Sequence, residues 1–455
     1  MKTITIIGSG LAGTLLTLYL ARRGYKIELY ESREDMRAHD MISGRSINLA
    51  LSCRGITGLE RLGLMAEVEK IMVPMRARAI HLPNGEIKYQ AFGRHHEEYI
   101  NAILRGELNK LLLNKAEEEA EVNLYFEKKL IGIDVGQKKL EFLANDGSVF
   151  TRDYELLIGA DGVSSLVRNA LVDEKIISAT RQFLPHGYKE LSIAKEHRQG
   201  FLPEHLHLWP RESFMLLGNP NCDDSITGTL FLPQEGKNSF ADLNNDDSIR
   251  LFFKEKFYDA YQAMPHLIEE FARHPVGNLS TVKCAPWYFE DQCLIIGDAA
   301  HGLVPFFGQG MNSAFEDIRV LNEFLDHYHD DWRQVLPAFY ASRKPNTDAV
   351  AAMSMDNYHE IQKDISDKRF LLRKQTEQEL MQKYPNRYIS KHVLVMFTNT
   401  PYVKAKAYGE VQNDLLEHVC AKIQCTKEIN WSHVDKLMDQ YDKKLAKINT
   451  LYETN

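Results

Sequence analysis

The sequence predicts an α/β fold in which one nucleotide-binding sheet is assembled from distant segments, followed by a separate β-sheet region and a helical C-terminal region. An apolar strand followed by a glycine-rich turn occurs at GSGLAG (8–13), GADG (159–162) and GDAAH (297–301). Residues 183–233 are rich in strand-forming residues punctuated by proline, and from about residue 332 the chain is mostly charged helix. A single nucleotide fold built from separate pieces explains the recurring pattern better than three nucleotide sites would.

The first 33 residues are the unit around which the rest is organised. A β-branched strand ends at Gly8, and Gly8, Gly10 and Gly13 fit the pattern G-x-G-x-x-G. The helix that follows, ended by Gly24, would direct its N-terminal amides at a pyrophosphate. Glu31 ends the second strand, where a carboxylate can accept hydrogen bonds from ribose hydroxyls. Because strand, helix and acid have the expected spacing, a dinucleotide site, for NAD or FAD rather than NADP, is favoured over an ordinary β-turn-α unit.

The elements of the next hundred residues follow from local patterns. GRSINLAL (44–51) leads into a helix expected over about 53–71. Residues 76–92 predict two strands around a turn at Pro83-Asn84-Gly85, and Arg105 begins a helix. Four further strands are expected near residues 122–126, 130–135, 139–143 and 148–150, with a hairpin turn at Asn145-Asp146-Gly147.

The later elements are a buried strand at Leu156–Ile158, a separate sheet over 183–233 and helices over 245–274. Residues 293–325 then predict a strand, a glycine-rich loop and a helix.

Composition excludes several classes of protein. At 455 residues the chain should form about two or three subdomains. The net charge of −8 argues against a nucleic-acid surface, so no nucleic-acid partner is expected. The six cysteines form no C-x-x-C pair, which favours reduced thiols in the cytoplasm over disulfides or a zinc site. No signal peptide is recognisable and no apolar run reaches the roughly 18 residues of a membrane span, so no membrane partner is expected.

Together, GSGLAG with Glu31, GADG and GDAAH resemble the three signatures of the FAD-dependent aromatic hydroxylases, the single-component flavin monooxygenases. The resemblance implies a Rossmann-like FAD-binding domain of that type, with an inserted β-sheet substrate domain and a helical C-terminal cap. The implied boundaries are 1–75, 105–175 and 280–330 for the FAD-binding domain, 76–104 and 176–279 for the substrate domain, and 331–455 for the cap.

The same resemblance implies tightly bound FAD and a set of residues around it. Asp298 would contact the ribityl region, although it could instead cap the following turn. Asp161 would contact the cofactor or hold its own loop, and Arg105 would lie near the flavin or be a surface residue at a helix start. Met311 and Asn312 would offer backbone groups to the pyrimidine end of the flavin. The other implied cofactor-binding residues are Gly8, Gly10, Ala12, Gly13, Glu31, Ser32, Arg33, Ala50 and Leu130, and the loop residues Pro305, Phe306, Gly308 and Gln309 would position flavin and substrate.

Five further motifs resemble the kynurenine-hydroxylating branch of that family, in its soluble bacterial type. They are GRSINLAL (44–51), MRARAIH (75–81), PHGYKEL (185–191), LHLWP (206–210) and VPFFGQGMN (304–312). The resemblance implies hydroxylation of L-kynurenine to 3-hydroxykynurenine in tryptophan degradation, with NADPH and O₂, through a flavin C4a-hydroperoxide. NADPH would bind transiently, since the chain has no second G-x-G-x-x-G unit. No catalytic side chain and no metal are expected, because the cofactor carries the chemistry.

The substrate-binding residues implied by the resemblance are partly altered in this chain. The carboxylate-binding arginine falls on Arg78, and its amide partner falls on Asn357. Two tyrosines of the family fall on Phe92 and His392, and an apolar pocket position falls on Asn219. His392 could still donate a hydrogen bond to a carboxylate, more strongly when protonated. These changes would weaken kynurenine binding or shift the substrate preference.

Alternative interpretations remain open from the sequence. Strand alternation places Arg76 and Arg78 on the same face, so position alone does not single out Arg78. His301 could be catalytic, but a structural role is at least as well supported. The chain could hydroxylate another anthranilate-like or tryptophan-derived ring, or it could be a non-catalytic flavin-binding module. A flavin-dependent halogenase is disfavoured because the sequence has no W-x-W-x-I-P segment.

Overall fold

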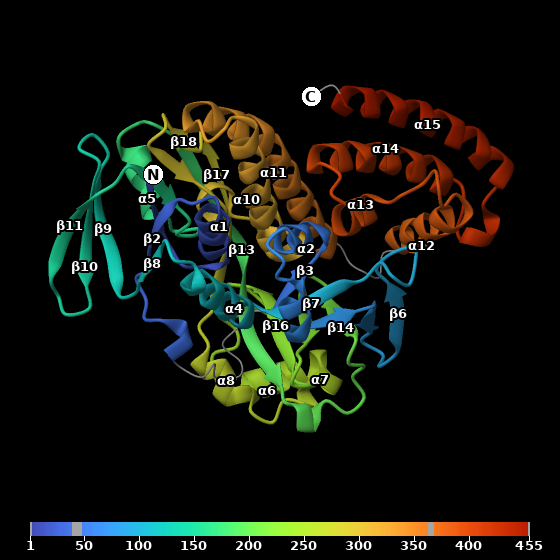
Figure 1. Ribbon diagram of the computed structural model, residues 1–455. Helices are drawn as coiled ribbons and strands as arrows, with labels where there is room; N and C mark the ends of the chain where they lie inside the picture. Colours follow the sequence, from blue (N-terminus) through green and yellow to red (C-terminus); the bar gives the residue numbers. More distant parts are fainter. Residues whose placement is uncertain (1, 39–47, 363–367, 454–455) are drawn as a thin grey trace.

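The computed structural model describes residues 2–38, 48–362 and 368–453. It has the α/β fold that the sequence predicts: a six-stranded sheet, a seven-stranded sheet, two small three-stranded sheets and a helical C-terminal region. In Figure 1 the two large sheets occupy the body of the molecule, and the last helices, coloured orange to red, lie together on one side.

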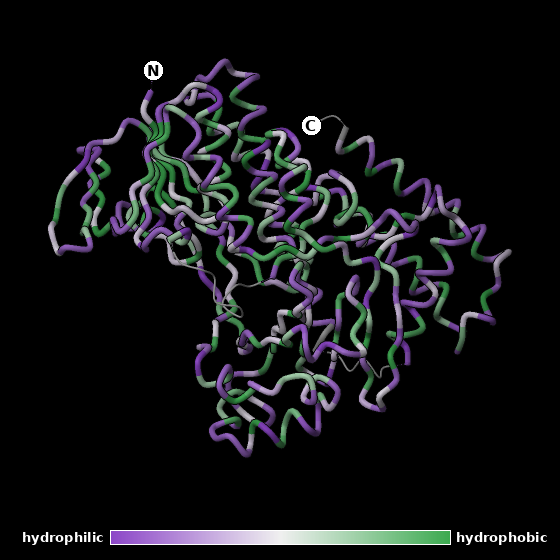
Figure 2. Tube along the Cα trace, turned by 60° about the horizontal axis from the view of Figure 1, so that its bottom comes forward, coloured by the Kyte–Doolittle hydropathy of each residue, from purple (hydrophilic) through white to green (hydrophobic). Residues whose placement is uncertain are grey.

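The six-stranded sheet is assembled from segments far apart in the chain. Neighbouring strands run parallel except at one edge, where the first two strands are antiparallel. The interior strands are buried and nonpolar, as expected for a covered parallel sheet, and Figure 2 shows them as a hydrophobic bundle near the N-terminus. From edge to edge the strands are β18 (Tyr288–Phe289), β19 (Cys293–Ile295), β12 (Leu156–Gly159), β1 (Thr3–Ile7), β2 (Lys26–Tyr30) and β8 (Val122–Tyr125).

The strand register brings the three predicted glycine-rich turns to one edge of this sheet. β1 pairs with β12 so that Ile7 lies opposite Gly159, and β12 pairs with β19 so that Gly159 lies opposite Ile295. Because these strands are parallel, all three turns follow the same, carboxyl edge of the sheet, where ligands bind in open α/β folds. The prediction of one fold assembled from separate pieces is confirmed.

The helices of this part of the fold differ from the prediction at one point. The helix expected over 53–71 is not continuous, because Gly63 has φ +66°, which an α-helix cannot contain. The sequence carries the signal for the break in Gly63 itself. The helices are α1 (Leu11–Arg22), α2 (Cys53–Glu60), α3 (Met65–Val68), α4 (Arg105–Glu118), α5 (Leu166–Asp173), α9 (Asp298–His301) and α10 (Gly310–His327).

Two small sheets flank the large one. The first contains β9 (Lys128–Asp134), β10 (Lys139–Ala144) and β11 (Val149–Asp153), with the predicted hairpin at 145–147 between its last two strands. The second has the order β3 (Asn48–Leu51), β7 (Ile100–Leu104) and β4 (Met72–Met75). Of the motif GRSINLAL, residues 44–47 lie outside the described residues. β7 belongs to the segment 76–104, and it pairs with β3 and β4.

The seven-stranded sheet carries the region that the sequence predicts as a separate sheet. One face packs against three helices through a cluster rich in phenylalanine, which includes Phe252, Phe253 and Phe257. These helices are α6 (Asp246–Lys256), α7 (Tyr258–Gln262) and α8 (Leu267–Arg273). The strands in order are β17 (Gly277–Ala285), β13 (Ser178–Ile193), β16 (Ile226–Pro233), β15 (Phe214–Pro220), β14 (His205–Arg211), β5 (Ala77–His81) and β6 (Ile87–Ala91).

A buried histidine pair connects this sheet to α7. His207 Nε2 faces the carbonyl oxygen of Leu202 at 3.0 Å and must donate to it. The other ring nitrogen of His207 therefore accepts a proton from His81 Nε2 at 2.9 Å. His81 also faces Asp259 at 2.6 Å, and Asp259 accepts a further bond from Trp209. His81 therefore donates through both nitrogens, whereas His207 is neutral.

We expect His207 to make the stability of the protein fall at acid pH. Burial, followed by the neighbouring His81, lowers the pKa of His207 to about 4, so the unfolded chain binds a proton more readily between that value and pH 6.5. From pH 7 to pH 5 this difference should remove about 2 kcal/mol from the free energy of unfolding. Urea denaturation of the wild type and His207→Gln at both pH values measures it. The difference in stability between the two proteins should shift by that amount in favour of the variant, and an equal difference at both pH values would contradict the prediction.

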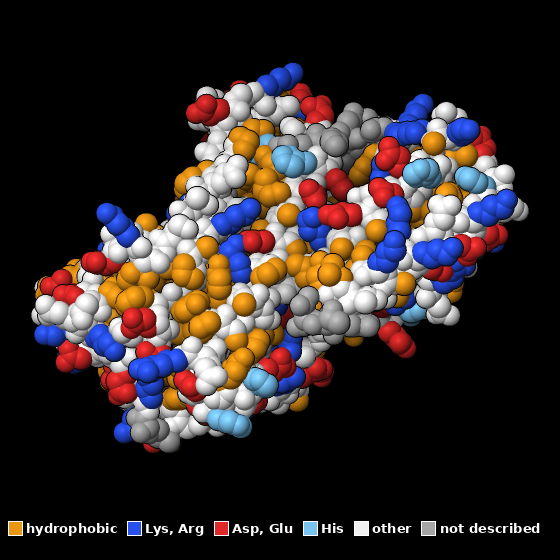
Figure 3. All heavy atoms as spheres, turned by 90° about the horizontal axis from the view of Figure 1, so that it is seen from above, with side chains coloured by type: hydrophobic (Ala, Val, Ile, Leu, Met, Phe, Trp, Pro, Cys, Tyr) orange, Lys and Arg blue, Asp and Glu red, His pale blue; other side chains and the backbone are white. Residues whose placement is uncertain are grey.

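The C-terminal region is helical, as predicted. Three of its last four helices share a small core of their own, which includes Tyr388, Val434 and Met438. On the face drawn in Figure 3, acidic and basic side chains are interspersed over this region. Within the residues described, no helix has both the length and the nonpolar character needed to cross a membrane. The helices are α11 (Trp332–Gln362), α12 (Lys368–Lys383), α13 (Lys391–Phe397), α14 (Tyr402–Cys420) and α15 (Trp431–Glu453).

Candidate active site

The glycine-rich turn after β1 is closely packed at two glycines and open at the third. Gly8 has φ +99°, and a Cβ there would lie 2.6 Å from the carbonyl oxygen of Ala160. A Cβ at Gly13 would lie 1.9 Å from the carbonyl oxygen of Gly8. A Cβ at Gly10 would meet only Arg105 Nη2, at 3.9 Å. The turn therefore leaves the backbone at Gly10 accessible, on the side where Arg105 lies.

Glu31 is held at the end of β2 by several donors. Its Oε2 accepts bonds from the amide and hydroxyl of Ser9, at 3.0 and 3.1 Å, and its Oε1 accepts bonds from Ser32 and from the amide and Nε of Arg33. Burial raises the pKa of Glu31, but the ion pair with Arg33 and the backbone donors outweigh it and lower the pKa to about 2. The side chain of Arg33 is 75 % exposed, so it can give way to another donor. Ser9, which the sequence analysis missed, joins the glycine turn to this carboxylate.

The two other predicted acids at this edge differ in their surroundings. Asp298 is exposed at the first position of α9, directly after Gly297 with its φ of +62°. Asp161 instead accepts bonds from the backbone amides of Leu166 and Val167 through Oδ2, at 2.7 and 3.2 Å. Its side chain therefore holds the start of α5, as the alternative interpretation has it. The other oxygen of Asp161 is buried without a described hydrogen-bond partner, and burial raises its pKa.

Two predicted residues lie where separate segments meet. The Cβ of Ala12 lies 3.2 Å from where a Cβ on Gly297 would be, so the first and third turns are in contact. The Cβ of Ala50 lies 3.4 Å from the corresponding point at Gly308. Leu130 is buried in β9, and it packs in the main core.

The loop before α10 is fixed by side chains that point back into the protein. Pro305–Phe307 form a single 3₁₀ turn, and Gly308 follows in the left-handed region with φ +61°. Asn312 uses its amide completely: it accepts a bond from the amide of Ser52 and donates to the carbonyl oxygens of Ala50 and Gly308. The neighbouring Met311 packs in part against the main core. α10 begins at Gly310, directly after this loop, so the positive end of its helix dipole faces the loop.

Arg78, Phe92 and His392, three of the predicted substrate-binding residues, come together. Arg78 Nη2 lies 3.0 Å from His392 Nε2, and the Arg78 guanidinium lies over the ring of Phe92 at 4.3 Å. The rings of Phe92 and His392 are nearly parallel, with centroids 6.5 Å apart. His392 is also 6.1 Å from the ring of Phe307, on the loop before α10. Three distant segments of the chain therefore form one cationic corner beside that loop.

In this structure the ring of His392 is neutral, and donation to a carboxylate through its other nitrogen stays a prediction. A guanidinium can only donate, so His392 Nε2 accepts and the ring carries its proton on Nδ1. Burial lowers the pKa of His392 well below its usual value, and Arg78, Lys374 and Lys391 lower it further. His392 is therefore a neutral acceptor that orients Arg78.

Arg78 is the available cation of this corner. No carboxylate among the described residues forms an ion pair with it, whereas Arg76, two residues earlier, pairs with Glu204 at 2.8 Å. Burial lowers the pKa of Arg78 to about 10, so the group remains charged at neutral pH. A half-buried, charged guanidinium that has no counter-ion among the described residues suits a carboxylate ligand.

Asn357 lies on the loop side of the site. Its amide donates to the carbonyl oxygen of Phe306 at 3.3 Å, and its neighbour Tyr358 donates to His186 at 2.9 Å. Phe306 packs against Tyr358 and against Phe231 of the seven-stranded sheet. A nonpolar cluster that includes Met215, Leu217 and Val304 continues from there.

Two further residues singled out from the sequence, Asn219 and His301, lie in different surroundings. Asn219 is buried in β15, on the same strand face as residues 215 and 217 of the nonpolar cluster. His301 pairs with the buried Asp317, which also binds Arg343 at 2.6 Å. This favours the structural role of His301.

Known proteins are similar to this chain in sequence and in fold. Residues 1–200 and 262–353 match the model of the family described as FAD binding domain. A kynurenine 3-monooxygenase of Legionella pneumophila (strain Corby) is 63% identical over 448 residues, which cover 98% of this chain and 100% of that protein. A kynurenine 3-monooxygenase of Myxococcus xanthus (strain DK1622) is 39% identical over 439 residues, covering 96% of this chain and 94% of that protein.

Solved structures share the fold at lower identity. A tetrameric 2-methyl-3-hydroxypyridine-5-carboxylic acid oxygenase aligns with a TM-score of 0.65 at 21% identity, over 80% of this chain and 94% of that one. Pseudomonas aeruginosa PqsL, in complex with 2-aminobenzoylacetate, aligns with a TM-score of 0.64 at 23% identity, over 79% of this chain and 96% of that one.

The fold and the family match define an FAD-dependent monooxygenase of the aromatic-hydroxylase type. Within that class, the chain belongs to the kynurenine 3-monooxygenase family.

Proposed function

We propose that this protein hydroxylates L-kynurenine to 3-hydroxykynurenine, with NADPH and O₂ as co-substrates and FAD as the bound cofactor. The observation that carries the proposal is the corner at Arg78: a charged guanidinium without a described counter-ion, beside the loop that precedes α10. The amino-acid end of kynurenine supplies the carboxylate that this corner lacks.

The residues at the carboxyl edge of the six-stranded sheet fit FAD. The accessible backbone at Gly10, with Arg105 beside it, suits the pyrophosphate, and Glu31 suits the adenosine ribose once the exposed Arg33 gives way. Asp298 is exposed at the same edge and is free to meet the ribityl chain. We assign the remaining contacts to Ala12, Gly8, Gly13, Ser32, Ala50, Leu130, Asp161 and the backbone of Met311 and Asn312.

Bound FAD would supply the redox chemistry, taking up a hydride from NADPH and activating O₂. The side chains of this chain would bind and orient the substrate. Arg78 would hold its carboxylate, with His392 keeping the guanidinium in place and Phe92 packing against it. Asn357 and the loop residues Pro305, Phe306, Gly308 and Gln309 would place the aromatic ring.

The proposed substrate activates its own ring, so the protein does not have to supply a strong base. An aromatic amine donates electrons to the ring carbon next to it, so oxygen transfer there requires no strong base. The nonpolar cluster around Phe231 and Phe306 would exclude water from the reacting ring. We place the reaction in the cytoplasm, where the six free cysteines would stay reduced.

A second candidate is a hydroxylase of another anthranilate-like or tryptophan-derived ring. Phe92 and His392 favour it, because the first offers no hydrogen bond to a ligand and Nε2 of the second is occupied with Arg78. Both candidate functions use the same fold and cofactor, and they differ only in the aromatic ring that the pocket would accept.

The test follows NADPH oxidation by the FAD-loaded protein with and without L-kynurenine, with product identification by mass spectrometry. Stimulated oxidation with accumulation of 3-hydroxykynurenine supports the proposal. Stimulation that yields only hydrogen peroxide would mean that kynurenine is bound but held wrongly for oxygen transfer. If kynurenine has no effect on a flavin-loaded protein, the substrate assignment fails. A panel of anthranilate and tryptophan derivatives then tests the second candidate.

A further inference from the structure

The start of α14 contacts the loop that we assign to the flavin through one buried tyrosine. Tyr402 is the first residue of α14 and is fully buried. Its hydroxyl group donates a hydrogen bond to Gln309 Oε1 at 2.7 Å. Gln309 is itself only 1% exposed and directly precedes α10.

Gln309 also contacts residues that hold the backbone around the flavin loop. Its Nε2 lies 3.3 Å from the hydroxyl of Ser52 and 3.3 Å from the sulfur of Met396. The amide of Ser52 in turn donates to Asn312, whose side chain donates to the carbonyl oxygens of Ala50 and Gly308. Both ends of the Gln309 amide therefore bind protein groups, and neither is left for a ligand.

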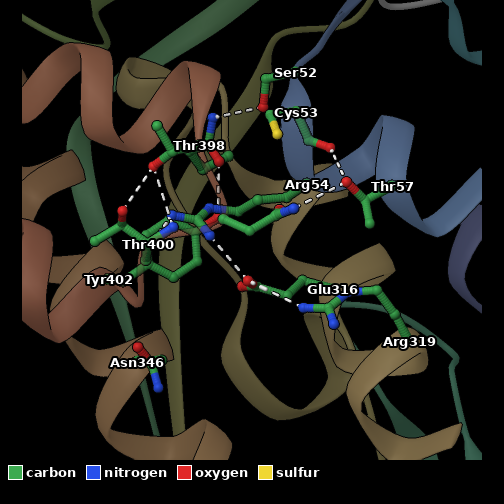
Figure 4. Close-up of polar contacts among 12 residues, drawn as sticks. Ser52, Cys53, Arg54, Thr57, Glu316, Arg319, Asn346, Thr398, Thr400 and Tyr402 are labelled. Carbon is green, nitrogen blue, oxygen red and sulfur yellow. Dashed lines mark hydrogen bonds and ion pairs between the residues drawn. The ribbon is translucent and has the colours of Figure 1, made fainter. Parts of the chain in front are cut away.

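The ring of Tyr402 packs against the guanidinium of a buried arginine, Arg54 (Figure 4). The Arg54 guanidinium lies over this ring at 4.0 Å. Arg54 also donates to Glu316 at 2.9 Å and to the carbonyl oxygen of Thr400 at 2.5 Å. Burial raises the pKa of the Tyr402 hydroxyl, so the group keeps its proton and can only act as the donor toward the Gln309 carbonyl oxygen. The direction of the bond is fixed.

The helix between the two sites is held at both ends. α13 carries His392 near its start, where His392 accepts a bond from Arg78. Beyond its end, the chain is held through Thr400 and Tyr402. A helix of seven residues is only about 10 Å long, so it links the substrate corner directly to the flavin loop.

We propose that Tyr402 is a positioning residue of the hydroxylation reaction, which acts through Gln309 to fix the loop 305–312 relative to α13. The inference rests on the proposed function, because it assigns that loop to the flavin and His392 to the substrate corner. Tyr402 would touch neither cofactor nor substrate. Without the hydroxyl group of Tyr402, Gln309 Oε1 is left buried and unpaired, and the loop loses its defined position.

The experiment compares Tyr402→Phe with Tyr384→Phe as the matched control. Tyr384 is also buried in the helical region, and its hydroxyl donates at 2.7 Å to Asp435, within the core of the last helices. In Tyr402→Phe the ratio of hydroxylated product to hydrogen peroxide should fall about fivefold or more, as loss of a buried hydrogen bond predicts. The Michaelis constant for kynurenine should change less than about twofold, because Arg78 is untouched. Tyr384→Phe should change neither quantity, and equal ratios in the two variants would overturn the inference.

A double-mutant cycle with Gln309→Leu tests the route of the effect. If Tyr402 acts through Gln309, the double variant should lose no more coupling than the stronger single variant. Fully additive losses would overturn the inference. Gln309→Leu also removes the bond independently if Tyr402→Phe fails to fold.

A measurement without turnover separates this inference from the proposed function. The visible circular dichroism of bound FAD, recorded without substrate, should change in Tyr402→Phe and Gln309→Leu and stay unchanged in Tyr384→Phe. If wild-type protein does not hydroxylate kynurenine, the proposed function fails while this comparison still tests the loop. Identical spectra in all variants would overturn the inference.

Discussion

Replacing Arg78 by alanine should raise the Michaelis constant for L-kynurenine by about 100-fold or more, the equivalent of about 3 kcal/mol for two lost charge-assisted hydrogen bonds. The guanidinium is the charged group of its corner, and no described carboxylate pairs with it. Its removal also leaves His392 Nε2 without its donor. Steady-state kinetics of product formation measure the effect, and Arg78→Lys should fall between alanine and wild type, because an ammonium lacks the planar fork.

Arg76 provides the matched control for this prediction. It lies two residues away, but it is paired with Glu204. Arg76→Ala should change the Michaelis constant by less than about threefold, the range of an exposed ion pair. An Arg78→Ala variant that retains wild-type kynurenine binding would contradict the assignment of Arg78.

The second large effect is expected at Gly10, whose alanine variant should fold normally but bind FAD about 100-fold more weakly. In the folded protein a Cβ at this position meets only Arg105 Nη2, at 3.9 Å, and the backbone is extended with φ −71°. The added methyl group therefore disturbs nothing in the protein itself. It would instead occupy the place that we assign to the pyrophosphate. Titration of apoprotein with FAD, followed by flavin fluorescence, measures the affinity.

Gly13→Ala separates packing from cofactor binding. Its Cβ would lie 1.9 Å from the carbonyl oxygen of Gly8, so this variant should lose about 3 kcal/mol or more of stability even without FAD. Thermal denaturation of the two apoproteins makes the comparison. If Gly10→Ala binds FAD as tightly as wild type, the pyrophosphate does not lie against Gly10.

The candidate site could be predicted where its determinants are local. Gly8, Gly10 and Gly13 were recognisable because a tight turn between strand and helix restricts a few neighbouring positions. The hairpin at 145–147 was recognisable for the same reason. Gly63 carried a comparable signal, but the leucines around it favoured a continuous helix over 53–71.

Other parts of the site depend on which distant segments meet. The sequence suggested His392 as a donor, but only its placement against Arg78 shows that its Nε2 must accept a hydrogen bond. Tyr402 was not predicted at all, because its partner Gln309 lies 93 residues away. No local pattern reports such a pairing.

The nucleotide fold, its glycine-rich turns and the segments that build it can be read from the sequence, because backbone conformation and strand burial depend on near neighbours and on residue type. The sequence also determined that an arginine stands at position 78. Only the three-dimensional arrangement shows that Arg76 has a carboxylate partner while no described carboxylate pairs with Arg78, that His392 is neutral, and that Tyr402 donates to Gln309. The physical reason is that charge state and hydrogen-bond direction depend on which groups share a buried volume, and those groups come from all parts of the chain.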